Sequence, residues 1–395
     1  GEAFDFVPRA FIMPRDFDEF KADVERHPAR MYIRKPTNSS RGRGIRMVVK
    51  PAELPRDTKD VLIQHYIDPP HVINKRKFDM RIYVTATCFD PLRVYVFSDG
   101  LARFAMGEYS QSKADLTDRS VHLTNYSISK KLKNVDANEV IDGDDNTVSK
   151  WSLKALRAHV EAEGRVSWEH IWSQVHSIIA CTMLSVEPSI NTHVKIKVPH
   201  RNNCFEVWGF DIMLDDSFKA WLIEVNTYPS LAADSKIDRR VKNACVADLL
   251  HMLGVVPYDM EQYEAVQEER KRAKLTGLGG REDFSGGKGG GAGGPRTVHD
   301  AAAIDFRGVA DKELPDVVRE AEAELARCRE WQRVFPCLAD PTRYLDQFDT
   351  PRSNNIMVCN YYAQRMGQPR WKPGGEGNRA GPQVHEWRPG GVSQL

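Results

Sequence analysis

The sequence predicts an α+β fold over its first 257 residues, followed by a glycine-rich linker and a short helical extension. Three observations lead to this prediction. Strand-forming runs come in pairs joined by short turns, at 79–89 with 92–97 and at 205–214 with 220–225. Apolar residues recur at helical spacing over 168–186. Ten glycines in the eighteen positions 277–294 can sustain neither a helix nor a core.

The remaining elements are expected in the following order. Two strands at 30–35 and 45–50 flank a turn rich in Ser, Gly and Arg, and a third strand lies at 61–67. A charged helix is expected at 263–274 and an amphipathic helix at 314–331. The run at 333–365 is apolar enough to fold, whereas 368–395 is rich in Gly and Pro and is expected to be disordered. These features divide the chain into 1–257, 258–298, 299–366 and 367–395.

The composition excludes functions that depend on a large net charge. Of the 395 residues, 41% are hydrophobic and 28% are charged, and 56 Lys and Arg against 55 Asp and Glu leave a net charge of +1. Bulk charge therefore predicts neither a nucleic-acid partner nor a membrane partner. The longest uncharged stretch, 170–186, is too polar and too short to span a bilayer. The seven cysteines form no CxxC pair, which is typical of a reduced intracellular protein.

Basic residues gather around the first turn. Seven occur between positions 30 and 50 without an acid, and Lys35 ends a strand just before a Ser/Gly turn that contains Arg43 and Gly44. Glycine lets backbone N–H groups converge on anionic oxygens, and a lysine adds a point charge. The pattern predicts a polyphosphate cradle. The alternative is a glycine-containing hairpin turn with a solvated basic rim.

Oxygen ligands are predicted on the last hairpin. Glu224 and Asn226 are two residues apart on a strand and therefore share a face. Centring the turn between positions 217 and 218 puts Asp211 opposite Glu224. Unpaired carboxylates are costly in such an apolar hairpin, and a hard cation removes that cost. Two carboxylates and an amide, with water, suit Mg²⁺. The alternative is an Asp/Glu pair that is salt-bridged to Arg or Lys.

A third group of charges occupies one strand. Lys77, Asp79 and Arg81 alternate along the chain and therefore lie on one face. They predict a polar cleft, and Arg103 and the run 124–126 extend the same polar character. A solvated strand face is the alternative.

Taken together, these strings resemble the tubulin tyrosine ligase-like family of ATP-grasp ligases. The family's motifs occur in its order across residues 6–257: the phosphate loop (35–45), the adenine-contacting hinge (64–67), the ribose and phosphate strand (77–84), two further signatures (100–104 and 122–127) and the metal hairpin (209–211 with 224–226). Within the family the chain is most similar to the glutamylases, particularly those that place the first branch glutamate. This similarity rests on 199–206, 229–234 and Lys242.

The resemblance implies ATP and Mg²⁺ as cofactors and assigns roles to individual residues. The catalytic residues would be Arg43, Arg81, Arg103 and Glu224. The nucleotide would be held by Lys35, Arg43, Gly44, Gln64, His65, Tyr66, Ile67, Lys77, Asp79, Thr124, Asn125 and Asn226. The substrates would be held by Arg43, Arg103, Tyr126, Lys150 and Lys242, and Mg²⁺ by Asp211, Glu224 and Asn226.

The resemblance implies an ATP-dependent tubulin glutamylase. The γ-carboxylate of a tubulin-tail glutamate would form an acyl phosphate, and the amine of free L-glutamate would displace phosphate to give an isopeptide branch. Tubulin tails and microtubules would be its partners, as a monomer or in an axonemal assembly, with neither nucleic acid nor membrane. It would lie in the cytoplasm and cytoskeleton, in a cilium, axoneme or basal body. The alternatives are a structural microtubule or axoneme component on a ligase fold, and a ligase that adds glycine or modifies a protein other than tubulin.

Three departures from the family's pattern stand out. The ligase core normally has an N-terminal domain before Phe4, and the sequence predicts that this domain is lacking here. His65 replaces the usual Lys of the hinge, with little expected effect if the contact is made through the backbone. Thr227 and Tyr228 replace the small residue and the Ser that the family has before Pro229, and Tyr228 is expected to reshape the floor of the amino-acid pocket and alter the choice of amino acid.

Overall fold

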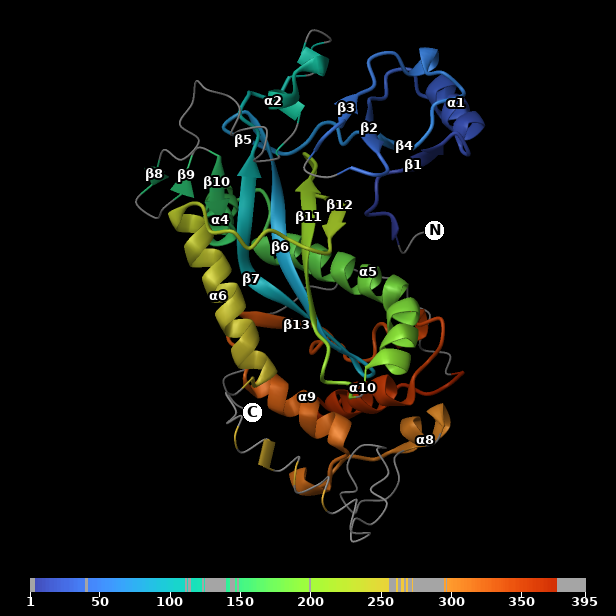
Figure 1. Cartoon of the computed structure of the whole chain (residues 1–395), viewed down its shortest axis with the longest axis vertical. Helices are drawn as coiled ribbons and strands as arrows, with labels where there is room; N and C mark the ends of the chain where they lie inside the picture. Colours follow the sequence, from blue (N-terminus) through green and yellow to red (C-terminus); the bar gives the residue numbers. More distant parts are fainter. Residues whose placement is uncertain are drawn as a thin grey trace.

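The computed structural model describes residues 4–39, 42–110, 112, 115–122, 124, 140–142, 146–147, 149–198, 200–255 and 297–374, with isolated positions between 261 and 295. It confirms an α+β fold, built on antiparallel sheets (Figure 1). Within these ranges no helix is long and apolar enough to cross a membrane. The helix expected at 263–274, the linker at 277–294 and the part of the expected tail beyond 374 lie outside the described residues, apart from isolated positions. The expectation of disorder is wrong for residues 368–374, because Trp371 is buried in the core of the large sheet.

A small sheet of four strands lies at the upper right of Figure 1, in the order β1, β4, β2, β3. Its strands are β1 (Ala10–Met13), β2 (Tyr32–Pro36), β3 (Arg46–Met47) and β4 (Val61–His65). Helix α1 (Phe17–Arg26) covers one face, where Phe11, Phe20, Tyr32 and Ile63 are buried together. Strand residues that alternate with these therefore lie on the other face of the small sheet. A short 3₁₀ turn, η2 (Pro51–Glu53), follows β3.

The large sheet runs down the centre of Figure 1 and contains nine of the described strands. Its main path is β12 (Ala220–Asn226), β11 (Glu206–Leu214), β6 (Arg76–Phe89), β7 (Leu92–Phe104), β10 (Lys150–Ser152), β9 (Asn146–Thr147) and β8 (Val140–Asp142). Strand β5 (Val72–Ile73) pairs with β6, and β13 (Trp331–Phe335) pairs with β7. Between β7 and β8 the chain forms η3 (Asp115–Thr117) and α2 (Arg119–His122).

The two faces of the large sheet differ in chemistry. One face is apolar: Phe78, Met80, Ile82 and Val84 of β6 pack with residues of α4 (Leu153–Glu163) and α5 (Trp168–Lys197). On the opposite face, α6 (Lys236–Leu253) covers Tyr83 and its neighbours. Lys77, Asp79 and Arg81 of β6 lie on this second face because side chains alternate along a strand. The charged residues of the predicted cleft therefore share one face of the sheet.

Helix α5 is longer than the sequence predicts. The expected helix ends at position 186, but α5 continues through Pro188 to Lys197. Its second half is anchored by Asn191, whose Nδ2 donates to the carbonyl oxygen of Phe89 (3.1 Å) and to the Oε1 of Glu187 (2.6 Å). The bond to Phe89 ties this part of the helix to the large sheet and offsets the hydrogen bond that the proline removes from the helix.

The segment after residue 297 contains a strand as well as helices. It forms α8 (Val298–Ala303), η4 (Asp311–Glu313), α9 (Asp316–Ala326), β13, η5 (Leu345–Gln347) and α10 (Ser353–Arg365). The helix expected at 314–331 ends at Ala326, and Trp331 then pairs with Phe97 of β7. Val334, Phe335, Ile356 and Cys359 belong to the same apolar cluster as the core of the large sheet. The extension and the sheet therefore share one core.

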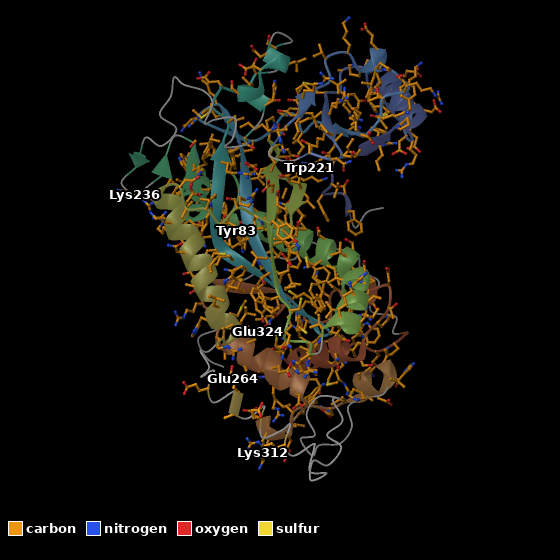
Figure 2. The ribbon with its side chains drawn as sticks, in the orientation of Figure 1. Tyr83, Trp221, Lys236, Glu264, Lys312 and Glu324 are labelled. Atoms are coloured by element: carbon orange, nitrogen blue, oxygen red, sulfur yellow. The ribbon has the colours of Figure 1, made fainter. Side chains whose placement is uncertain are left out.

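A buried polar network joins the extension to the second face of the sheet. Glu324, labelled in Figure 2 where α9 meets the sheet, accepts hydrogen bonds from the hydroxyls of Thr87 (2.8 Å) and Tyr95 (2.5 Å). Arg333 donates to the hydroxyls of Tyr95 and Tyr362 (2.6 Å to Tyr362) and to a backbone carbonyl of α9. Each charge in this network therefore has partners in the interior.

Candidate active site

A row of charged side chains crosses four neighbouring strands of the large sheet. Asp211 of β11 lies opposite Glu224 of β12 on one side and opposite Arg81 of β6 on the other. One step along, Asp79 of β6 lies opposite Arg103 of β7. The expected pairing of Asp211 with Glu224 is present, but the turn is not centred where the sequence predicts. Nearer the turn, Ile212 pairs with Leu222, one position off the expected register, and a bulge after Asp211 restores the pairing with Glu224.

Asp211 is the centre of the row. Its Oδ1 lies 2.6 Å from the Nε of Arg81, and its Oδ2 lies 3.1 Å from the Nη2 of Arg81 and 2.8 Å from the Nη2 of Arg103. Arg103 also forms a two-point ion pair with Asp79 through its Nε and Nη2. Burial alone would raise the pKa of Asp211, but Arg103 and Arg81 together lower it well below its ordinary value. Asp211 is therefore held as a carboxylate.

Glu224 and Asn226 complete a set of oxygen donors beside Asp211. The Nδ2 of Asn226 lies 3.1 Å from Glu224 Oε1 and 3.4 Å from Asp211 Oδ2. The side chain of Glu224 is exposed at the edge of the site, but partial desolvation by its neighbours and the charge of Asp211 raise its pKa. Within the described residues Glu224 forms no ion pair, so the salt-bridged alternative applies to Asp211 and not to Glu224. Two carboxylates and an amide at this spacing have the chemistry that Mg²⁺ prefers.

Lys35 of the small sheet and Lys77 of the large sheet lie beside this row, where the two sheets meet. The Nζ of Lys35 donates to Gln64 Oε1 (2.6 Å), and the charges of Glu224 and Asp211 oppose the lowering of its pKa by burial. Lys77 is buried and donates to the Tyr66 hydroxyl (2.9 Å) and to a carbonyl of α2 (3.2 Å). Burial lowers the pKa of Lys77 to about 7. Cationic and anionic groups of the two sheets therefore meet at one junction.

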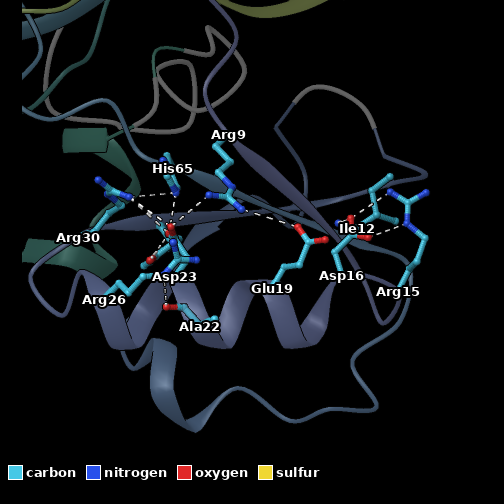
Figure 3. Close-up of polar contacts among 11 residues, drawn as sticks. Arg9, Ile12, Arg15, Asp16, Glu19, Ala22, Asp23, Arg26, Arg30 and His65 are labelled. Carbon is cyan, nitrogen blue, oxygen red and sulfur yellow. Dashed lines mark hydrogen bonds and ion pairs between the residues drawn. The ribbon is translucent and has the colours of Figure 1, made fainter. Parts of the chain in front are cut away.

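The side chain of His65 lies away from this junction. It alternates with Gln64 and Tyr66 on the hinge, and it contacts α1 on the other face of the small sheet. Figure 3 shows its Nε2 beside Asp23, at 2.8 Å, with Arg30 and Arg9 around the same carboxylate. Its side chain is thus occupied by the support of α1, which leaves only its backbone for a ligand at the junction.

We expect Asp23→Asn to destabilise the small sheet by about 1–3 kcal/mol, because Asp23 is buried and accepts from Tyr32 (2.8 Å) and His65. Burial alone would raise the pKa of Asp23, but these bonds and nearby charges lower it. The stability it contributes is therefore present above its ordinary pKa and lost as pH falls through the lowered value. Thermal denaturation from pH 3 to 7 measures this. Glu25→Gln, at an exposed position of α1, is the control, and equal melting of both variants would contradict the prediction.

The loop expected to hold phosphate is shaped by glycine. Gly44 has φ +73°, and a Cβ at this position would lie 2.7 Å from Pro36 Cγ, so no other residue fits without a shift. The hydroxyl of Ser39 donates to the backbone carbonyl of Arg43 (2.8 Å), and the Arg43 side chain is exposed. The loop therefore combines a tight turn with an accessible cation.

The residues expected to hold the amino acid are only partly brought together. Lys150 lies opposite Arg103 in the sheet register, and its Nζ donates to Asp238 of α6 (2.8 Å). Lys242 also pairs with Asp238, at 3.0 Å. Asp238 is not among the predicted site residues, although its position one turn before Lys242 was a usable signal. Asn125 and Tyr126 lie outside the described residues, and Thr124 is half-buried.

Tyr228 does not line the floor of a pocket. Its side chain is 89% exposed, so the expected reshaping of the amino-acid pocket is absent in this structure. Gly209 also contributes to the site, although no separate role was predicted for it. A Cβ there would lie 2.9 Å from Pro229 Cβ and 3.0 Å from Arg81 Cδ. Gly209 therefore provides the space in which Arg81 reaches Asp211.

A cavity of about 350 Å³ borders the junction. Ile33, Met47, Leu116 and His122 form part of its wall, together with Arg34, Arg46, Val48, Val49, Leu54 and Asp118. His122 contacts the hydroxyl of the hinge residue Tyr66 (3.0 Å). The cavity is thus next to the hinge and continues toward the free edge of β3.

Curated proteins are similar to this chain over most of its length. The tubulin monoglutamylase TTLL4 of Mus musculus is 34% identical over 92% of this chain, which covers 31% of that protein. The tubulin polyglutamylase ttll-4 of Caenorhabditis elegans is 34% identical over 90% of this chain and 57% of that protein. The tubulin polyglutamylase TTLL5 of Pongo abelii is 31% identical over 93% of this chain, which covers 29% of that protein. The chain thus spans between about a third and somewhat over half of these relatives.

The family comparison covers the whole region that contains the site. Residues 1–263 match the tubulin-tyrosine ligase family, and this range includes both sheets up to β12 and helix α6. All the motifs that predicted the resemblance fall inside it. The chain belongs to the tubulin-tyrosine ligase family.

Proposed function

We propose that this protein is an ATP-dependent tubulin glutamylase with an ATP-grasp core. The observation that carries the proposal is the junction at which Asp211, Glu224 and Asn226 face Lys35, with Arg81 and Arg103 in the same row. Such a site can bring several anions together and neutralise them, which is what a ligase for acidic substrates requires. The names of its relatives, tubulin monoglutamylase and polyglutamylase, support the choice of glutamate and of tubulin.

The donor set of the hairpin fits a magnesium ion. Asp211, Glu224 and Asn226 would hold Mg²⁺, and Lys35, Gly44 and Lys77 would hold the ATP phosphates. Bound Mg·ATP supplies an activated phosphoryl group. The chain's own residues keep that charge neutralised: Lys35 lies close enough to Glu224 and Asp211 for their charges to oppose its loss of a proton.

The reaction needs no nucleophile from the protein. The γ-carboxylate of a tubulin-tail glutamate attacks the γ-phosphorus of ATP, which releases ADP and gives an acyl phosphate. The amine of free L-glutamate then attacks the acyl carbon, phosphate leaves, and the amine loses a proton. Arg103, Lys150 and Lys242 would bind the carboxylates of the incoming glutamate, since guanidinium and ammonium groups pair with carboxylates. A tubulin substrate would place the protein in the cytoplasm and cytoskeleton, including cilia.

The proposal is tested by offering tubulin, Mg·ATP and one labelled amino acid at a time to the full-length protein. We expect incorporation of glutamate, and neither glycine nor tyrosine should be incorporated at a comparable rate. Omission of ATP or addition of EDTA should abolish the signal. Glycine incorporation alone would overturn the assignment of the substrate. Microtubule binding without incorporation of any amino acid would point to a structural component.

A further inference from the structure

We propose that Asp211 is a positioning residue that withholds Arg103 from the acidic amino-acid substrate until nucleotide is bound. The inference rests on the proposed function and adds a binding order to it. The carboxylate of Asp211 is shared by Arg81 and Arg103. When Mg·ATP neutralises Asp211, Arg103 becomes able to bind a carboxylate of free glutamate.

The carboxylate of Asp211 has no acceptor site to spare. Its oxygens are approached by four donor contacts: the Nε and Nη2 of Arg81, the Nη2 of Arg103 and the Nδ2 of Asn226. A carboxylate offers about four lone-pair directions. Asp211 is 2% exposed, so water cannot relieve this competition. A cation can therefore bind Asp211 only if at least one of these contacts is released.

Of the contacts that Asp211 makes, the one with Arg103 is the most easily released. Arg81 holds Asp211 at two points, and it is packed against Gly209, where even a methyl group would come within 3.0 Å of its Cδ. Arg103 contacts Asp211 through its Nη2, at 2.8 Å, and the described residues show no two-point hydrogen bonding between them. A single charged contact is weaker than a two-point pair.

Release from Asp211 makes one edge of the Arg103 guanidinium available to another carboxylate. Asp79 holds Arg103 along the edge formed by Nε and Nη2. The opposite edge, formed by Nη1 and Nη2, is the second fork through which a guanidinium can bind a carboxylate at two points. Its Nη2 is engaged by Asp211, and its Nη1 forms no hydrogen bond within the described residues. Loss of the Asp211 contact opens this fork while Asp79 keeps the guanidinium in place.

The consequence is positive coupling between nucleotide and glutamate. Each ligand must strengthen the binding of the other by the same factor, because the same event serves both. Couplings of this kind typically amount to about 5- to 150-fold in affinity. We therefore expect L-glutamate to bind the full-length protein at least about tenfold more tightly in the presence of Mg·AMP-PNP than in its absence.

Calorimetric titration of L-glutamate into wild-type protein and Asp211→Asn, each with and without Mg·AMP-PNP, tests the inference. Asparagine keeps the size of the side chain and removes its charge. We expect Asp211→Asn to bind glutamate without nucleotide about tenfold more tightly than the wild type does, and to gain little when Mg·AMP-PNP is added. A merely structural role of Asp211 would not increase affinity. Asp216→Asn, at an exposed turn position of the same hairpin, should behave as the wild type.

The possible outcomes separate the inference from the proposed function. If the wild type binds glutamate with Mg·AMP-PNP and Asp211→Asn gains nothing without it, the inference is overturned and the proposed substrate stands. If neither protein binds glutamate under any condition, the proposed substrate and the inference fail together. Should Asp211→Asn not fold, Mg·ADP replaces Mg·AMP-PNP on the wild type. It lacks the γ-phosphate, so tighter glutamate binding then supports the release of Arg103, and unchanged binding overturns it.

Discussion

Glutamate incorporation by the Glu224→Gln variant should fall by at least about 100-fold, the scale of losing a charged group that stabilises the reacting phosphates. Glutamine keeps the length of the side chain and one oxygen, so the hydrogen bond from Asn226 can persist. What is lost is the negative charge that a divalent cation requires at this position. Labelled-glutamate incorporation into tubulin with Mg·ATP measures the effect.

The same substitution should leave folding intact or stabilise it slightly. Partial desolvation and the charge of Asp211 raise the pKa of Glu224, so its ionised form is disfavoured in the folded protein. Wild-type stability is therefore expected to decline as pH rises through this raised pKa, whereas the glutamine variant lacks this decline. Glu206→Gln, on β11 outside the charged row, serves as the control and should retain incorporation. Full incorporation by Glu224→Gln would remove the hairpin from the proposed mechanism.

Replacement of Arg333 with alanine should destabilise the protein by about 3–5 kcal/mol, the usual effect of breaking a buried charge network. Arg333 is buried and donates to Tyr95, to Tyr362 and to the carbonyl of Ala321. Its loss leaves these acceptors without their donor and leaves the buried Glu324 with less positive charge nearby. We expect both a lower melting temperature and faster proteolysis of residues 297–374.

The control for this prediction is Arg329→Ala. Arg329 is exposed and precedes β13, so its removal deletes an arginine of the same segment without opening the interior. Surface substitutions of this kind usually change stability by about 0.5 kcal/mol or less. If Arg333→Ala melts within that margin of the wild type, the network contributes specificity of docking rather than stability.

The elements that could be predicted were those specified by nearby residues. Alternation placed Lys77, Asp79 and Arg81 on one face, and the short turn brought Asp211 close to Glu224, although a bulge after Asp211 is needed to pair them. Each of these patterns extends over at most fourteen residues of the chain. Over so short a distance, strand geometry restricts which side chains can share a face or lie opposite one another.

The groups that were missed depend on partners far away in the sequence. The ion pair of Arg81 with Asp211 spans 130 residues, and the pair of Lys150 with Asp238 spans 88. No local pattern specifies such pairs, because they arise from the stacking order of strands and helices. The strand at Trp331 was missed for the same reason: its partner β7 lies more than two hundred residues earlier, and the helical spacing before it continued past Ala326.

The pairing of β13 with β7 has a consequence for how the chain reaches its native state. Strand β10 pairs with the end of β7 around Ala102, while β13 pairs with its beginning around Val96. Until residues 331–335 have been synthesised, the first half of β7 presents an open hydrogen-bonding edge that can pair with another chain. Contacts of such long sequence separation also form slowly. The nascent protein thus exposes an unpaired, aggregation-prone strand edge through much of its synthesis. The yield of folded protein in cells should therefore depend on chaperones that shield this edge.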